Sequence, residues 1–117
     1  MDPWYALGSG DMLEVASMGL HVALMTSQSA MHQCFDAVTR NPAKVMQLEA
    51  YGLEPGCHAD FVLLQARDPI EAIRLRATRL KVYRRGKLLA ETPASTAALH
   101  MQGRPAHATF LPDRALG

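Results

Sequence analysis

NPAKVMQLEAYGLEPGCHADFVLL, residues 41–64, is the stretch that decides the fold of this chain. Asn41 followed by Pro42 predicts the start of a short helix, because Asn is a good N-cap and Pro is favoured in the first helical position. The glycines and the proline of residues 52–56 then predict a turn. The apolar run at residues 61–64 predicts a buried strand. The stretch therefore joins a capped helix, carrying Val45, Met46 and Leu48 inward, to a tight turn and a strand.

Two longer helices are predicted before this stretch. Asp11 is a good N-cap for the first, at about residues 12–25, which is apolar almost all round. A helix with so little polar surface is expected to be buried on several sides. The second, at about residues 29–39, ends before Asn41-Pro42. It carries one apolar stripe at helical spacing, made of Met31, Cys34, Phe35 and Val38.

The part of the chain after residue 64 predicts a short helix and a hairpin. Asp68-Pro69 opens the helix, which continues through Ile73. Apolar and polar residues alternate from residue 80, and Arg85-Gly86 turns the chain back into residues 87–91, which predicts a β-hairpin. One more short strand is expected near residues 97–101, and then a tail. Helices followed by a strand, a helix and a hairpin predict a small α+β domain.

Composition limits the classes of protein. The chain has 117 residues, of which 49% are apolar, enough for one globular domain with a core. Twelve basic and eleven acidic residues leave almost no net charge, so we expect no nucleic-acid partner. We also expect no membrane partner, because the sequence shows neither a membrane-spanning run nor a secretory signal. Cys34 and Cys57 are expected to be reduced thiols in a cytoplasmic protein.

Two sets of residues resemble the C-terminal part of cytosine deaminases in the amidohydrolase superfamily. NPA at residues 41–43, followed by G-x-x-P-G-x-x-A-D at residues 52–60, is similar to the superfamily pattern. DPWYALG at residues 2–8, together with Met12 and the MGLH run at residues 18–21, is similar to cytosine deaminases and to relatives that act on other aminated nitrogen heterocycles. The resemblance covers most of the chain.

The resemblance implies an α/β fold for the whole enzyme, a (β/α)8 barrel with a metal at the C-terminal ends of its strands. A small β-sandwich is assembled from the first and last strands. In those terms, residues 1–49 are expected to be the terminal loop and helices of the barrel, and residues 50–91 the C-terminal half of the sandwich. Residues 92–117 are expected to form the last short strand and the tail.

The activity that the resemblance implies is hydrolytic deamination of cytosine or a related heterocycle. In the family a divalent metal, zinc or iron, lowers the pKa of a bound water, with three His and an Asp as ligands. A Glu and a further His move protons. All of these residues precede Met1 in the family's order, so we expect no catalytic residue, no metal ligand and no activity of this chain alone. Its own histidines lack the spacing that aims two imidazoles at one ion: His21, His32, His58, His100 and His107.

Trp4 is the residue to which the resemblance gives a role. In the family the Trp of this loop lines the substrate pocket, where a flat indole packs against a pyrimidine. Tyr5, Leu7 and Met12 are candidates for the border of the same pocket. The alternative is that a lone Trp near a terminus only plugs the mouth of the barrel.

Two other hypotheses remain open from the residues. The first is a non-catalytic module that associates with itself or with the missing N-terminal barrel portion. Without the barrel strands, the helix at residues 12–25 and the sheet edges would expose apolar surface and unpaired backbone groups. The second is an amidohydrolase of N-alkyl or amino triazines, which the absent pocket residues would distinguish from a cytosine deaminase.

Overall fold

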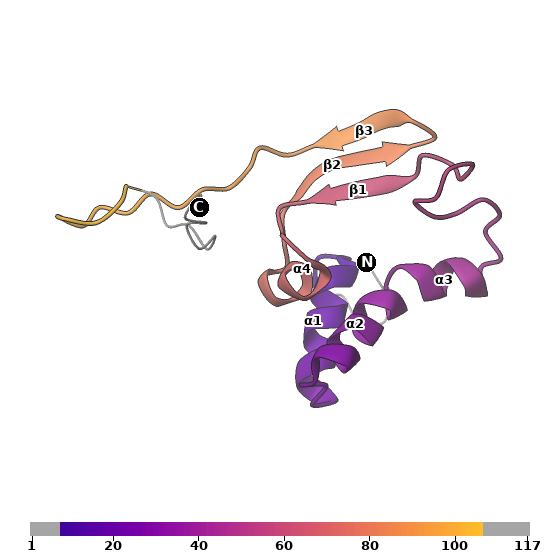
Figure 1. Cartoon of the computed structure of the whole chain (residues 1–117), viewed down its shortest axis with the longest axis horizontal. Helices are drawn as coiled ribbons and strands as arrows, with labels where there is room; N and C mark the ends of the chain where they lie inside the picture. Colours follow the sequence, from indigo (N-terminus) through magenta and orange to yellow (C-terminus); the bar gives the residue numbers. More distant parts are fainter. Residues whose placement is uncertain (1–7, 107–117) are drawn as a thin grey trace, which may run out of the picture.

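The computed structural model describes residues 8–106, which form a group of helices beside one end of a three-stranded sheet (Figure 1). The predicted α+β class is confirmed. The elements in chain order are α1 (Met12–Val22), α2 (Gln28–Ala37), α3 (Arg40–Val45), β1 (Phe61–Leu64), α4 (Pro69–Leu75), β2 (Arg79–Arg84) and β3 (Lys87–Glu91).

Local capping explains where α1 and α2 begin. The Asp11 carboxylate accepts a hydrogen bond from the Leu13 N–H at 2.7 Å, which confirms the predicted N-cap. The Ser27 hydroxyl accepts one from the Ala30 N–H at 3.2 Å and starts α2. α1 ends at Val22, before the predicted residue 25, because Leu24 has a positive φ of 52° that leaves the helical region.

The prediction that Asn41 caps α3 is wrong. The helix begins at Arg40, with Thr39 in the cap position, so Asn41 already lies inside the first turn. The Thr39 hydroxyl donates to the Phe35 carbonyl at 2.8 Å, so this residue is tied back to α2 and the junction is too short for a later cap. Ala43 is the buried residue of α3. The residues predicted to point inward are exposed instead: Val45, Met46 and Leu48.

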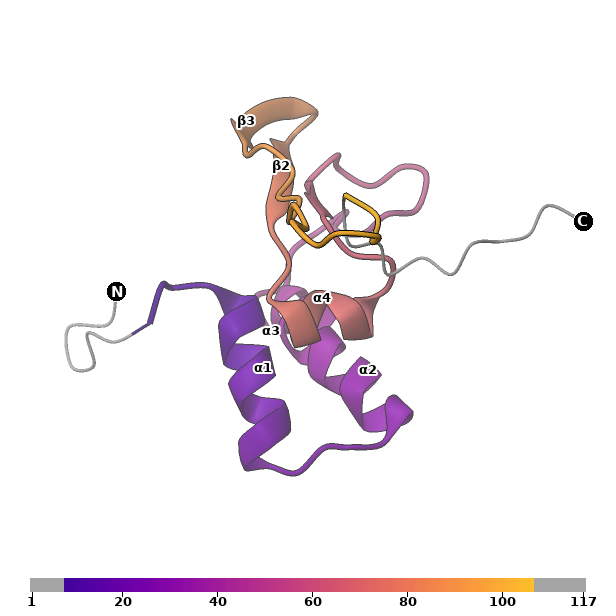
Figure 2. The same ribbon diagram turned by 90° about the vertical axis from the view of Figure 1, so that its left-hand side faces the viewer.

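The sheet is antiparallel with β2 in the centre, between β1 and β3. The hairpin is confirmed, and its two turn residues, Arg85 and Gly86, both have positive φ, as a two-residue type I′ turn requires. In Figure 1 the helices lie on the β1 side of the sheet, and in both views β3 lies farthest from them (Figures 1 and 2). β3 is exposed along its whole length.

Two strand predictions need correction. β1 forms at the predicted residues, but it is not a buried strand, since Val62 and Leu63 are 43% and 46% exposed. A strand is buried only when both faces of its sheet are covered, and the helices lie near one end of this sheet. Around the predicted strand at residues 97–101, the described residues hold an isolated bridge at Ala98 and a hydrogen bond from the Leu99 N–H to the Ala106 carbonyl.

The core lies where α1, α2 and α4 meet. Four buried residues form it, one or two from each helix: Leu13, Ala16, Cys34 and Ile73. Ile73 is fully buried. The Cys34 thiol donates to the Ala16 carbonyl at 3.4 Å, and both Cys34 and Cys57 are free thiols. Leu64, at the end of β1, packs against this cluster and connects it to the sheet. Within residues 8–106, no helix has the length and apolar character needed to cross a membrane.

Ile73→Ala should lower the free energy of unfolding by about 2–5 kcal/mol, because it removes buried methyl groups and leaves a cavity between three helices. Leu75→Ala, at a half-exposed position of the same helix, is the matched control and should cost about 1 kcal/mol or less. Urea unfolding followed by circular dichroism measures both. Equal effects of the two substitutions would contradict the assigned core.

Candidate functional site

The predicted site residue, Trp4, lies outside the residues that the structure describes, as do Tyr5 and Leu7. The described residues begin at Gly8, the last residue of the DPWYALG pattern, and Ser9 follows it with contacts to α1. The Ser9 N–H and hydroxyl both donate to Glu14 Oε2, at 3.1 and 2.6 Å. These two hydrogen bonds lower the pKa of Glu14. α1 therefore holds the segment that leads back to the loop.

A second contact fastens the same segment to the sheet. Arg79 of β2 donates from both terminal nitrogens to the two carboxylate oxygens of Asp11, the N-cap of α1. The hydrogen bonds from Arg79 are the main cause of the lowered pKa of Asp11, and the bond from the Leu13 N–H adds to it against the opposing effect of burial. One carboxylate thus caps α1 and joins it to a residue 68 positions later in the chain.

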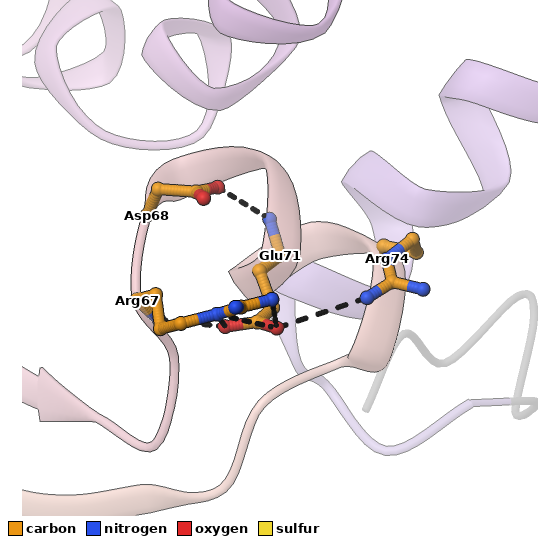
Figure 3. Close-up of polar contacts among 4 residues, drawn as sticks. All are labelled: Arg67, Asp68, Glu71 and Arg74. Atoms are coloured by element: carbon orange, nitrogen blue, oxygen red, sulfur yellow. Dashed lines mark hydrogen bonds and ion pairs between the residues drawn. The ribbon is translucent and has the colours of Figure 1, made fainter. Parts of the chain in front are cut away.

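The other polar cluster surrounds Glu71 in α4 (Figure 3). Its carboxylate, which is buried, accepts from the Arg67 N–H at 2.7 Å and from the Arg67 guanidinium at 2.8 Å. Arg74 lies 3.7 Å from it on the exposed side. Asp68 accepts from the Glu71 N–H at 2.8 Å and caps α4. The hydrogen bonds from Arg67 hold the pKa of Glu71 below its ordinary value.

This cluster borders an open pocket of about 280 Å³ between α2 and α4, to which Gln28, His32 and Ile70 also contribute. The two arginines are balanced by two carboxylates, so the pocket has no excess charge to attract an anion. A carboxylate held in its charged form by an arginine is also a poor proton acceptor. We therefore assign Glu71 to the stability of α4. This cluster was not predicted from the sequence, although Asp68-x-x-Glu71 before an apolar run is a capping-box signal.

The four histidines among residues 8–106 lie in different parts of the chain, and His100 lies in the segment after β3. His21 is exposed in α1, His32 lies at the pocket on α2, and His58 lies in the turn before β1, where its N–H donates to the Ala50 carbonyl at 2.7 Å. His107 lies outside the described residues. Among residues 8–106, no three His, Cys, Asp or Glu side chains are placed to hold a metal ion. The described residues therefore do not fit the metal that the sequence resemblance implies.

Comparisons with known proteins agree with the fold and the sequence pattern. Residues 1–92 match the model of an amidohydrolase family (Amidohydro_3). The 5-methylcytosine deaminase of Klebsiella pneumoniae, solved with 5-fluorocytosine, superimposes with a TM-score of 0.76 and 34% identity over 84% of this chain. The N-isopropylammelide isopropylaminohydrolase of Burkholderia multivorans gives 0.71 and 36% over 77%. The N-isopropylammelide isopropyl amidohydrolase of Pseudomonas sp. (strain ADP) is 30% identical over 89 residues, or 75% of this chain.

Three helices followed by an antiparallel sheet, with this sequence pattern, are features that this chain shares with amidohydrolases. The chain belongs to the amidohydrolase family. It spans 22% of the length of the Pseudomonas relative, and 24% and 23% of the Klebsiella and Burkholderia chains.

The Asp11–Arg79 pair should make stability depend on pH. The folded-state pKa of Asp11 is lowered, so its contribution is fully present above the unfolded pKa of about 3.9 and is lost as pH falls through the folded value. Asp11→Asn keeps a capping oxygen but loses the charge, whereas Asp11→Ala also loses the cap, worth about 0.5–2 kcal/mol. Urea unfolding at pH 7 should therefore rank the variants wild type, Asn, Ala in decreasing stability.

The same variants show how much the Asp11–Arg79 pair contributes to the loss of stability at acid pH. Between pH 5 and pH 3, at about the range of the unfolded carboxyl pKa, the wild type should lose more stability than Asp11→Asn. Asp36→Asn, at a half-buried carboxylate of α2, is the control and should keep the wild-type slope. Identical slopes for wild type and Asp11→Asn would contradict a functioning ion pair.

Proposed function

We propose that this chain is the C-terminal part of a metal-dependent aminohydrolase that deaminates cytosine or a related aminated nitrogen heterocycle. The enzyme would hydrolyse a C–N bond that is not a peptide bond and release ammonia. The observation that carries this proposal is the structural similarity to 5-methylcytosine deaminase, at 34% identity over 84% of this chain. Small heterocycles, 5-fluorocytosine and phosphonocytosine, are bound in the solved structures of that relative.

In this proposal the chain forms part of the barrel, part of the β-sandwich and one wall of the substrate pocket. Residues 1–49 would form the terminal loop and helices of a (β/α)8 barrel, residues 50–91 the C-terminal half of a β-sandwich, and residues 92–117 a tail. Trp4 would pack against the flat heterocycle. The hydrogen bond from Ser9 to Glu14 and the ion pair of Arg79 with Asp11 hold residues 9–11 against α1 and β2, next to this loop in the sequence.

Amidohydrolases are in general metal-dependent, and the described residues form no metal site. We therefore propose that zinc or iron is held by residues outside them, in the rest of the enzyme. The chain by itself should then release no ammonia from cytosine above a blank containing zinc or ferrous iron alone.

A second substrate class is favoured by a specific observation. Two of the relatives carry names for the hydrolysis of N-isopropylammelide, and one of them is 36% identical to this chain. Hydrolysis of an N-alkyl or amino triazine is therefore the alternative. A non-catalytic module that associates with itself or with a partner is the remaining one, and it is supported by the large apolar side chains that are exposed on α1, α3 and β3.

A chimera tests the function. The segment of the Klebsiella deaminase that matches this chain is replaced by the complete 117-residue chain, and release of ammonia from cytosine and 5-methylcytosine is measured beside release of isopropylamine from N-isopropylammelide. We expect ammonia from a cytosine. Trp4→Ala should raise KM by about tenfold, as expected when one aromatic contact of about 1.4 kcal/mol is lost, and Trp4→Phe should restore most of it.

Three results would contradict either the proposed deaminase activity or the proposed role of Trp4. A folded, metal-loaded chimera without ammonia release from either cytosine would contradict the deaminase proposal, and release of isopropylamine alone would favour the triazine alternative. An active chimera in which Trp4→Ala leaves KM unchanged would remove Trp4 from the pocket.

A further inference from the structure

Two acidic side chains at the start of α1 lie beside the connection between α4 and β2, which carries two arginines. Asp11 accepts hydrogen bonds from both terminal nitrogens of Arg79. Hydrogen bonds from Ser9 and, to a smaller extent, the charge of Arg76 lower the pKa of Glu14. Opposite charges therefore meet at the point where the chain enters α1.

Arg79 is held in place by β1 and the core. It is the first residue of β2 and pairs with Leu64, which packs against the core cluster. The residue before it, Thr78, accepts a hydrogen bond through its carbonyl from the Gln65 N–H at 2.9 Å. Strand pairing and core packing therefore fix the backbone of Arg79 without any contribution from Asp11.

The segment before α1 has fewer restraints of its own. Gly8 and Gly10, on either side of Ser9, have positive φ angles of 85° and 73°. Glycine adopts this region without a steric penalty, but it also leaves the chain the widest choice of other conformations. Contacts with other parts of the chain must therefore select one path into α1, and the bonds of Ser9 and Asp11 make such contacts.

The contacts of Ser9 and Asp11 fix this segment relative to different elements. Ser9 binds Glu14, which belongs to α1 itself. Asp11 binds Arg79 of the sheet, and this second reference point limits pivoting of the segment about the end of the helix. The N-cap of α1 is completed by the bond from the Leu13 N–H to Asp11 at 2.7 Å. The arginine is therefore not needed to start the helix.

The size of the expected effects points to positioning more than to stability. The side chains of Arg79 and Asp11 are 36% and 20% exposed, and ion pairs open to solvent add little to the free energy of unfolding. By contrast, a displacement of about 1 Å at a substrate contact can cost about 10²-fold in rate. Removal of the guanidinium should therefore affect substrate binding more than folding.

We propose that Arg79 is a positioning residue for substrate binding. Through Asp11 it sets the direction in which the loop at residues 2–8 leaves α1, and with it the contact between Trp4 and the heterocycle. The inference rests on the proposed function, because it takes this loop as one wall of the substrate pocket. It adds a residue of the sheet that acts on the substrate through the loop and not by contact.

Steady-state kinetics of the chimera described above test the role of Arg79. Arg79→Ala should raise KM for cytosine by about fivefold and change kcat by less than about twofold, because a looser loop weakens binding of the substrate itself. Arg79→Lys should recover part of the loss, since one ammonium contact replaces a two-pronged one. Lys81→Ala is the matched control, because Lys81 also lies in β2 but pairs with Glu91 of β3. It should leave KM unchanged.

A double-variant cycle with Trp4 distinguishes positioning of the loop from a general structural effect. If Arg79 acts through the contact that Trp4 makes, Arg79→Ala has little left to disturb once Trp4 is replaced by Ala. The double variant should therefore have the kcat/KM of Trp4→Ala alone, within about twofold. A structural role of Arg79 elsewhere would instead give independent losses that multiply.

Hydrogen exchange gives a readout that needs no activity. In the complete chain and in the chimera, backbone amides of peptides covering residues 2–13 should exchange at least about threefold faster in Arg79→Ala than in the wild type. The same peptides should be unchanged in Lys81→Ala. Melting temperatures within about 3 °C of the wild type would show that both variants remain folded.

The outcomes separate the role of Arg79 from the proposed activity. Unchanged exchange in Arg79→Ala would overturn that role, whether or not the chimera releases ammonia. Multiplied losses in the double variant, or an equal rise of KM in Lys81→Ala, would overturn it as well. A folded, metal-loaded chimera that releases no ammonia but shows the faster exchange would contradict the deaminase and support Arg79 as the residue that holds the loop.

Discussion

The structure depends most on the packing of Ile73 against α1 and α2. Ile73 is the largest fully buried side chain among the described residues, and it brings α4 into contact with Leu13, Ala16 and Cys34. The sheet is joined to this cluster by Leu64 and by the Asp11–Arg79 pair. A core this small contributes little stability, so each of these connections matters more than it would in a larger domain.

In the described part of the chain, buried polar side chains all have hydrogen-bond partners, whereas many large apolar side chains are exposed. In residues 8–106 every buried side-chain nitrogen or oxygen has a hydrogen-bond partner, including the carboxylate of Glu71. Apolar groups are not matched in this way, because α1, α3 and β3 all carry large exposed side chains. Local polar contacts can be completed within a segment, whereas an apolar face needs a second layer. Within residues 8–106 the polar groups are therefore more completely partnered than the apolar ones.

The predictions that succeeded rest on interactions between neighbours in sequence. Asp11, Asp68 and the Arg85-Gly86 turn were identifiable because a cap or a two-residue turn is completed within a few residues. The predictions that were wrong concerned residues whose position depends on contacts between elements distant in the sequence. Asn41 lost the cap position to Thr39, which bonds to α2, and β1 is half exposed because its sheet is covered near one end only. The cluster at Glu71 could have been predicted from the sequence, because Asp68 and Glu71 have the spacing of a capping box.

The sequence by itself determined the family, through the pattern at residues 41–64, and the positions of most helices and strands, because caps, turns and periodicity are local. Tertiary structure alone decided which apolar residues are buried: Leu13 and Ala16 became core while Met18 and Val22 remained open. All four are apolar residues of one helix, so composition cannot separate them. Only the placement of α2 and α4 on one side of α1 does so, since burial is a property of the packed neighbours and not of the residue.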